Sequence, residues 1–338
     1  MSGGLVALSG MQRVIETTPG TALACTAIQP LLGGWLKENV ERRAPDEQRY
    51  SFIGAYRNYA VKNFVELSGI TIAPTFRDLS WWGCLFWKGL GAGGPPKVST
   101  GAVRDTTAYD YTFTPTIATD DLQTATLEVG DDTQNYQIPF VLGNKISLGW
   151  SVNGDLTCSM DMLGQRAVAA SKTAALAVVG DEQINGALTT VTIDTPSAIG
   201  TTAVTTVQSM NVSWDNGWAQ EFVLDGNIYP RGAHRGATKK VMLDATLLFN
   251  SATEYATYYQ TAAIGTQRKY RIDTLGTLAG ASTAYRELRV DVYAIYDDVE
   301  FDTINGQRAV KFSAHAEYAS AATHDQQVRI TTAAATTA

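Results

Sequence analysis

Residues 146–162, ISLGWSVNGDLTCSMDM, alternate apolar and polar side chains on both sides of an Asn-Gly pair. Alternation with a period of two is typical of a half-buried strand, and Asn-Gly favours a type I′ turn, whose central residues both need positive φ. A fainter copy, residues 210–222, contains a second Asn-Gly pair at 216–217. The sequence therefore predicts two like β-hairpins, as expected of a building block that assembles.

Other patterns predict mostly strands. The segment before residue 59 reads as loop-rich, and residues 59–72 alternate like a strand. Residues 76–90 have helical spacing behind Thr75, an N-cap candidate with Asp78 three residues later, and a second aromatic helix is predicted at residues 255–262. Further strands are predicted at residues 109–113, 124–129, 136–142, 189–193, 239–249, 270–272, 288–296, 309–318 and 328–330.

The same local order of strand, polar break, aromatic helix and strands occurs in both halves of the chain. This order predicts a mainly β protein of two tandem modules. The first module is residues 1–164 and includes an N-terminal arm, and the second is residues 207–338 and includes a C-terminal tail. Residues 165–206 form a connector between them. Trp81 and Trp82 leave the first helix little polar surface, so these side chains pack either in an ordinary core or against another subunit.

Composition excludes several classes of protein. The chain has 338 residues, 45% hydrophobic and 17% charged, which is enough for two domains with sizeable cores. A formal net charge of −7 argues against binding nucleic acid through its phosphates. Cys25, Cys84 and Cys158 lie in apolar contexts, which favours buried reduced thiols and a reducing compartment. We expect neither a signal peptide nor a membrane span, because no uncharged apolar run reaches roughly 18 residues.

Signals for catalysis, metals and cofactors are weak. His234, His315 and His324 form no metal-binding pair in the sequence, and no nucleophile signature occurs. His315 falls in an alternating strand and is interpreted as a packed or interface residue. The Gly-x-Gly-x-x-Gly match at residues 89–94 follows a helix, whereas a dinucleotide fingerprint follows a strand. The sequence predicts no enzyme, no cofactor and no metal site.

Five stretches, in their order along the chain, resemble the tail tube proteins of long-tailed bacteriophages, specifically the double-length type with two fused tube modules. The stretches are residues 16–21 (ETTPGT), 64–70 (FVELSGI), 127–130 (LEVG), 144–164 and 207–216 (VQSMNVSWDN). Each alone is a strand or turn pattern that many β proteins share. Their order over most of the chain gives the resemblance its specificity.

The resemblance implies β-sandwich modules, each with a flanking helix, whose inner sheets join those of neighbouring copies to line a tube. It favours trimeric over hexameric rings, stacked into a tube through which phage DNA passes without specific binding. If each module gives four lumen strands, three chains give about 24, and at about 4.8 Å spacing and about 40° tilt the backbone diameter is roughly 45 to 50 Å. It also implies tape measure, tail terminator and distal tail proteins as partners, no membrane, and a place in the virion tail after assembly in the host bacterial cytoplasm.

Charged clusters are the candidate assembly residues. A lumen lined with Lys and Arg would hold DNA phosphates, so an acidic or neutral lining is expected. The candidates for an acidic lumen or interface are Asp120, Asp121, Asp131, Asp132, Asp297, Asp298 and Glu300. Their alternatives are solvated loop charges or a calcium site, for which the spacing is poor.

Basic residues are candidates for contacts between rings or subunits, where a basic loop facing an acidic patch would favour one stacking polarity. The candidates are Arg42 and Arg43 in an early loop, and Arg231, Arg235, Lys239 and Lys240 in a flexible loop after the second hairpin. Solvated loops are the alternative for both groups.

Two other functions compete with a tube subunit. A virion decoration or carbohydrate-binding module needs clustered exposed tryptophans, yet Trp150 and Trp214 lie in alternating strands and are predicted to be buried. A glycoside hydrolase of all-β type needs paired carboxylates, which the sequence does not place.

Overall fold

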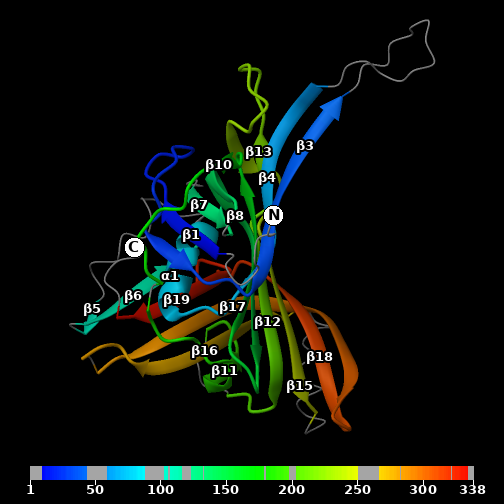
Figure 1. Cartoon of the computed structure of the whole chain (residues 1–338). Coiled ribbons are helices and arrows are strands. Elements are labelled where there is room, and N and C mark those ends of the chain that lie inside the picture. The colour runs from blue at the N-terminus through cyan, green and yellow to red at the C-terminus, as the bar shows by residue number, and fades with distance from the viewer. Residues whose placement is uncertain are drawn as a thin grey trace, which may run out of the picture.

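The computed structural model describes residues 10–43, 59–87, 103–105, 107–115, 123–131, 133–178, 180–197, 203–249, 266–281, 283–320 and 322–333. This part of the chain is mainly antiparallel β-sheet around one helix, α1 (Phe76–Phe86) (Figure 1). The first strands are β1 (Gly10–Ile15), β2 (Ala27–Gln29), β3 (Gly33–Arg43), β4 (Tyr59–Ile72), β5 (Val103–Asp105), β6 (Ala108–Phe113), β7 (Ala125–Gly130), β8 (Asn135–Ser151) and β9 (Thr157–Gly164). The later elements are β10 (Val168–Ala169), the short 3-10 helix η2 (Gly186–Leu188), β11 (Thr189–Asp194), β12 (Val207–Asp215), β13 (Trp218–Glu221), β14 (Gly232–Arg235), β15 (Lys240–Leu248), β16 (Arg268–Leu278), β17 (Tyr285–Ile304), β18 (Gln307–Ala316) and β19 (Gln326–Thr332).

Eight strands form a central antiparallel sheet in the order β3, β4, β9, β8, β12, β15, β18, β17, which we call the eight-stranded sheet. Its first four strands come from the first half of the chain and its last four from the second half. The two sets of four meet where β8 pairs with β12, with Leu148 opposite Val212. Both of these side chains are completely buried, so the two halves share one apolar core.

The two longest strands connect the eight-stranded sheet to outer layers. β8 pairs with β7 and β10 near its start and with β9 and β12 near its end. β17 likewise pairs with β16 and β19 first and with β18 afterwards. Each strand has a register shift where it turns, between Gly143 and Lys145 in β8 and between Tyr296 and Asp298 in β17. Such irregularities bend a strand, which lets one strand serve two layers of a sandwich.

The outer layers are completed by the remaining strands. One contains β2, β1, β7, the start of β8 and β10, and the other contains β11, β16, the start of β17, β19, β6 and β5. β13 and β14 pair only with each other in the described part of the chain.

Helix α1 lies between these layers and begins as predicted. The Thr75 hydroxyl accepts from the Asp78 amide at 3.0 Å, and the Asp78 carboxylate accepts from the Thr75 amide at 3.3 Å, so the capping box is complete. Trp87, directly after the helix, packs its ring against Trp214 and Phe113, with ring centroids 5.4 Å and 5.6 Å apart. The aromatic side chains of α1 are buried within this chain, which settles their role as core.

The hairpin predictions are confirmed in one case and wrong in the other. β8 and β9 form the predicted hairpin, but residues 152–156 connect them and neither Asn153 nor Gly154 has positive φ, so the turn is not type I′. β13 does not return along β12, because β8 and β15 already occupy both edges of β12. The buried Asn216 side chain also donates to the carbonyl oxygens of Phe86 at 2.8 Å and Gly143 at 2.9 Å, which redirects the chain.

The most important strand that the sequence did not predict is β3, which lies in the segment expected to be loop. The division at residues 164 and 207 stays a prediction, and strand pairings cross it: β6 pairs with β19, and β11 of the expected connector pairs with β16. The predicted helix at residues 255–262 lies outside the described residues.

Candidate assembly surface

The two faces of the eight-stranded sheet differ in chemistry. The face toward α1 is buried and apolar, and α1, β1 and β7 lie on that side of the long strands in Figure 1. The opposite face, which we call the polar face, carries Glu66, Ser147, Ser159, Asp161, Asn211, Ser213, Asp244, Thr246, Asp298, Glu300, Lys311 and Ser313. A hollow of about 560 Å³ lies on it, lined in part by Asn211, Asp244, Glu300 and Ser313. A sheet with one wet face needs such alternation.

Each of the five lysines of the eight strands stands opposite a carboxylate on a neighbouring strand. The opposed pairs are Lys37 and Glu66, Lys62 and Glu41, Lys145 with Asp161 and Asp215, Lys240 and Asp215, and Lys311 and Glu300. Lys62 contacts Glu41 at 3.5 Å, and Lys311 contacts Asp302 at 2.6 Å, which lowers the pKa of the Asp302 carboxyl through the hydrogen bond. The lysine charge on these strands is therefore locally compensated.

The outer edges of the eight-stranded sheet are open in the described structure. β3 pairs with β4 on one side, and residues 298–304 of β17 pair with β18 on one side, while no described strand occupies their other edges. The β3–β4 hairpin and the β13–β14 segment both project from the same end of the described fold in Figure 1. Apolar side chains accompany both edges: Trp35 is 42% exposed and Phe301 is 55% exposed. Unpaired edges of this kind are templates for pairing with another chain.

A buried ion pair supports the helix beneath this sheet. The guanidinium of Arg13 donates to the Asp78 carboxylate at 2.6 Å and to Gln29, and lies over the rings of Trp81 and Trp82. Burial lowers the pKa of Arg13, although the Asp78 charge opposes that shift. Because Asp78 also caps α1, one side chain connects the helix to β1.

The Glu16 carboxylate organises the segment ETTPGT. It accepts from the amides of Gly20 and Phe140 at 2.8 Å and 2.9 Å and from the hydroxyls of Thr124 and Thr126 at 2.6 Å and 2.8 Å. Glu16 is 4% exposed, so these four donors replace water around a buried charge. The same contacts hold Phe140 at φ 57°, just before β8 turns into the eight-stranded sheet.

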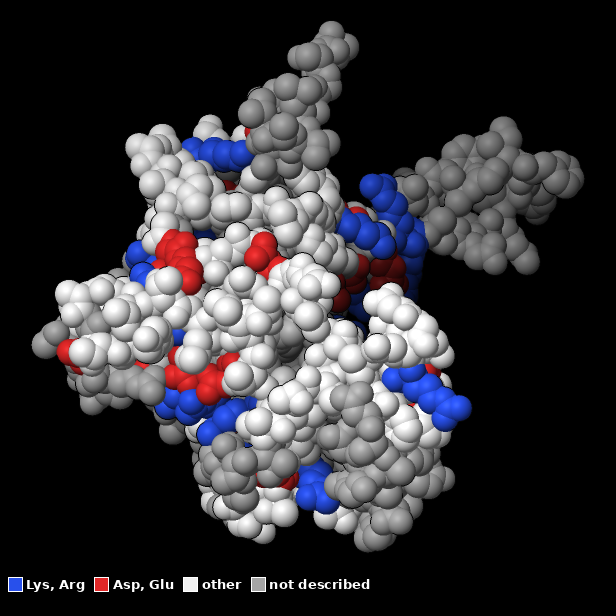
Figure 2. All heavy atoms as spheres, turned by 90° about the horizontal axis from the view of Figure 1, so that it is seen from below, with Lys and Arg blue, Asp and Glu red and all other residues white. Residues whose placement is uncertain are grey.

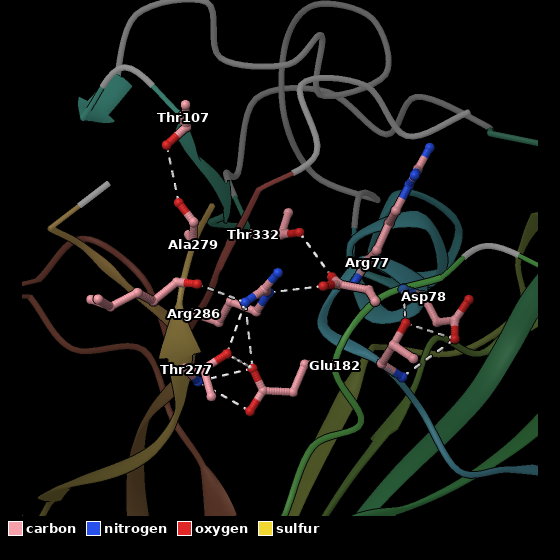
Figure 3. A network of polar contacts seen from close by, with 11 residues as sticks. Arg77, Asp78, Thr107, Glu182, Thr277, Ala279, Arg286 and Thr332 are labelled. Atoms are coloured by element: carbon pink, nitrogen blue, oxygen red, sulfur yellow. Dashed lines mark hydrogen bonds and ion pairs between the residues drawn. The ribbon is translucent and has the colours of Figure 1, made fainter. Parts of the chain in front are cut away.

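The connector ties the two halves together through a carboxylate pair (Figure 3). Asp181 accepts from the Arg77 amide at the start of α1 at 3.1 Å and from Arg286 Nε of β17 at 2.8 Å. Glu182 accepts from the amide and hydroxyl of Thr277 on β16. A negative charge at a helix N-terminus is favourable, so this clasp stabilises α1 as well as joining it to the second half.

Comparison with known families decides the identity. The sequence model of phage tail tube proteins matches residues 7–286, which is most of the chain. The chain belongs to the phage tail tube protein family. Its β-sandwich architecture and mainly β content agree with a structural protein of the virion tail. No curated protein matches the chain.

Of the acidic residues predicted in this tail tube protein, three lie together on β17. Asp298 and Glu300 project from the polar face, opposite Ser313 and Lys311, and Asp297 sits at the register shift, 2.5 Å from His315 Nδ1. Hydrogen bonds to Asp297 and Glu317 raise the pKa of His315 against the effect of burial. His315 thus lies on a strand, as predicted.

The other acidic candidates are separate from this group. Asp131 accepts from the amides of Thr133 and Gln134 at 2.7 Å and 2.8 Å in the turn before β8, and these bonds lower the pKa of its carboxyl. Asp120, Asp121 and Asp132 lie outside the described residues.

Four of the six basic candidates, Arg42, Arg43, Arg235 and Lys240, lie in strands rather than in the flexible loops that the sequence predicted. Arg42 and Arg43 end β3, and Arg43 contacts Glu41 at 3.5 Å. Arg231 precedes β14, is exposed, and contacts Asp225 at 3.7 Å.

Lys239 precedes β15, and Lys240 begins it, paired in register with Asp215. Arg235 is half-buried, because it donates to the Asn216 carbonyl at 2.6 Å and stacks on Trp218. Backbone pairing of β14 with β13, and of β15 with β12, positions the strands that carry Arg235 and Lys240.

The described residues on the end of the molecule seen in Figure 2 are mostly uncharged, and their basic groups lie in separate places, several of them beside acidic groups. The described residues contain no cluster of three or more His, Cys, Asp or Glu suited to a metal ion. None of the helices in the described structure is long and apolar enough to span a membrane. Cys25, Cys84 and Cys158 are buried as predicted, and burial raises the pKa of Cys25 to about 12. Trp150 and Trp214 are buried, so the tryptophans named for a carbohydrate-binding surface form core instead.

Proposed function

We propose that this protein is the major tail tube subunit, which closes into rings that stack into a hollow tube through which phage DNA enters the host. The observation that carries the proposal is the eight-stranded sheet, which has one polar face and two open edges. An isolated sheet with open edges is completed when copies join edge to edge, and a closed ring leaves no edge unpaired. A structural role of this kind requires no catalytic residues.

Ring size follows from the number of strands. Each half supplies four strands to the eight-stranded sheet, so three copies give about 24 strands and a channel wide enough for duplex DNA. We therefore favour a trimeric ring, in which the two halves of each chain alternate around the channel. A hexameric ring of the same strands would be about twice as wide.

The polar face suits a DNA conduit when it faces the channel. Lysines that lie opposite carboxylates neutralise few of the passing phosphates, so few counterions are released from the DNA. Asp244, Asp298 and Glu300 add negative charge to the same face. DNA would then pass without binding specifically. Lumen roles for the acidic residues on β17 remain part of this proposal.

Stacking of rings is assigned to the projecting segments. The loop between β13 and β14 exposes Leu224 completely, next to the exposed Arg231. Arg42 and Arg43 lie at the end of the projecting hairpin. A head-to-tail contact that uses such projections generates an open-ended stack. Lys239 and Lys240 lie where the β13–β14 segment returns to the sheet and belong to the same contact.

The wider assembly follows from a tail tube role. Tape measure protein inside the tube, and terminator and distal tail proteins at its ends, are the expected partners. Assembly takes place in the cytoplasm of the host bacterium before the tail is part of the virion. A decoration or carbohydrate-binding role has less support, because the tryptophans it would use are buried.

Electron microscopy of the purified full chain tests the proposal. We expect hollow tubes of uniform width, and averaged cross-sections with threefold symmetry and six similar lobes. Particles that stay monomeric across protein concentration and salt, or solid fibres without a channel, would contradict the proposed function.

A further inference from the structure

The junction between β8 and β12 is an internal template for the contact between copies. It joins the last strand of the first set of four to the first strand of the second set, with Ser147 opposite Ser213 and Leu148 opposite Val212. β17 is the last strand of the second set, and β3 is the first strand of the first set. A β17–β3 contact between two copies therefore repeats the β8–β12 contact within one copy.

The turns of β8 and β17 fix which residues correspond. After its register shift, β8 places Lys145 opposite Asp161 of β9, and β17 places Asp298 opposite Ser313 of β18. Lys145 thus corresponds to Asp298. Two and three residues later, Ser147 corresponds to Glu300 and Leu148 to Phe301.

The same step across the sheet relates β3 to β12. In the first half, Leu163 lies opposite Glu66, which lies opposite Lys37. In the second half, the corresponding row of residues across the strands is His315, which lies opposite Met242, which lies opposite Ser213. Lys37 therefore corresponds to Ser213, and Leu36 corresponds to Val212.

We infer that copies of this chain join through antiparallel pairing of β17 with β3 of the next copy, in the register that sets Glu300 opposite Lys37 and Phe301 opposite Leu36. This inference rests on the proposed function and adds the partner strand and the register.

The chemistry of both pairs fits this register. Lys37 and Glu300 are exposed, carry opposite charges and form no ion pair with any described residue, since Lys311 contacts Asp302 instead. Phe301, whose ring meets that of Phe249 edge to face, is 55% exposed, and Leu36 packs partly against the core. The register puts the charged pair on the polar face and the apolar pair on the core face, as Ser147–Ser213 and Leu148–Val212 are placed internally.

The acidic residues of β17 also disfavour the competing contact, in which the β17 strands of two copies pair with each other. Asp298, Glu300 and Asp302 alternate along β17, so two β17 strands paired with each other would set carboxylates against carboxylates. Like charges opposite one another destabilise a strand pair. Repulsion therefore favours the head-to-tail contact with β3, which closes rings, over a symmetric dimer.

Disulfide trapping tests the register directly. Residues directly opposite in antiparallel strands have Cα atoms about 4.5 to 5.5 Å apart, within disulfide range, whereas diagonal residues are about 7 to 8 Å apart. The double variant Lys37→Cys with Glu300→Cys should give covalent oligomers after mild oxidation of assembled tubes. The control Asn39→Cys with Glu300→Cys, slipped by two residues, should give few. The native thiols are buried and do not compete.

Charge reversal provides the second measurement. Lys37→Glu or Glu300→Lys should raise the protein concentration needed for assembly by roughly fivefold, and the two changes together should restore it. Both side chains are exposed, so the monomer should keep its circular dichroism spectrum.

The outcomes separate this inference from the proposed function. Tubes that form without the 37–300 cross-link, or that cross-link better through the slipped pair, overturn the register and leave the tube role standing. Failure of the unmodified chain to form rings or tubes overturns both.

Discussion

Several single residues of this protein carry a buried charge, and each of them connects separate elements of the fold. Arg13, Asp78 and Glu16 are each at most 4% exposed, and each bonds to at least two elements or segments. Burying a charge is costly unless partners replace water, so such residues are sensitive positions even when the pair contributes little net stability. The ETTPGT segment illustrates this: its sequence predicts a turn, but only the fold shows that Glu16 is satisfied by threonines more than 100 residues away.

Replacing Arg13 with Met should destabilise the fold by about 3 to 5 kcal/mol, because the buried Asp78 carboxylate loses its cationic partner. Urea unfolding of the monomer measures the change. The double variant Arg13→Met with Asp78→Asn should lose less than the sum of the two single variants, since no uncompensated charge stays buried. Strict additivity would show that the two residues act independently.

Asp273 makes the free energy of unfolding depend on pH. Burial, then the hydrogen bond and charge of Glu287, raise the pKa of Asp273 from 3.8 to about 6, while Arg289 opposes the shift. A raised folded pKa means that the protonated form is favoured in the fold, so its stabilising contribution is complete below pH of about 3.8 and is lost as the pH rises through about 6.

We therefore predict that Asp273→Asn makes the free energy of unfolding less dependent on pH between about 4 and 7 than in the unmodified chain. Urea titrations at several pH values measure this difference. Asp244→Asn, the same chemical change at an exposed position on β15, is the matched control. An unchanged slope in Asp273→Asn would show that another group causes the dependence.

At the scale of elements, the sequence predicts those strands and that helix whose apolar side chains are regularly spaced and buried. β4 and β6 appear close to their expected residues because alternation marks a buried side, and β7 and α1 do so although they are buried almost all round. β3 was missed because most of its side chains are exposed on both faces, which erases the alternation. The return strand after Asn216 was wrong because tertiary contacts to Phe86 and Gly143 override the local preference of Asn-Gly for a hairpin.

The candidate site was predictable in part for the same reason. Asp298 and Glu300 lie in an alternating strand and share a face with Lys311, as a period of two requires. The sequence predicts open sheet edges but not which strands form them, nor Lys37, because the strands at an edge are set by strand order and not by local sequence. Charge clustering alone also grouped Arg231 with Arg235, whose contacts differ.

The β13–β14 segment yields a prediction that separates those two arginines. Arg231→Glu should weaken polymerisation with little change in monomer stability, because this side chain is 71% exposed and contacts only Asp225 among the described residues. Arg235→Glu should lower stability itself, since it removes the bond to the Asn216 carbonyl and the stacking on Trp218. Thermal unfolding and turbidity of assembling protein measure the two effects. Equal polymerisation by Arg231→Glu and the unmodified chain would remove Arg231 from the stacking contact.

For the whole molecule, the two halves act as one body in the described structure. β8 pairs with β12, β6 pairs with β19, and the Asp181–Glu182 clasp joins α1 to β16 and β17 (Figure 3). Such interleaving keeps the eight strands in one sheet with a common polar face. A rigid sheet of this kind repeats the same surface chemistry in every copy that an assembly contains.

Because every copy in an assembly presents the same polar face, a substitution at one position changes the charge of that face in all copies. Asp244 lies opposite Asn211 and Ser313, so a lysine placed there has no carboxylate directly opposite, unlike the five native lysines of the sheet. In assembled tubes, Asp244→Lys should therefore retain short duplex DNA more strongly, and the retention should fall more steeply with salt, because each new phosphate contact releases counterions. Asp244→Asn removes the acid without adding a base and should stay close to the unmodified tube. Filtration of labelled DNA with tubes at several salt concentrations measures both. If Asp244→Lys and Asp244→Asn behaved alike, the polar face would not be the surface that DNA passes.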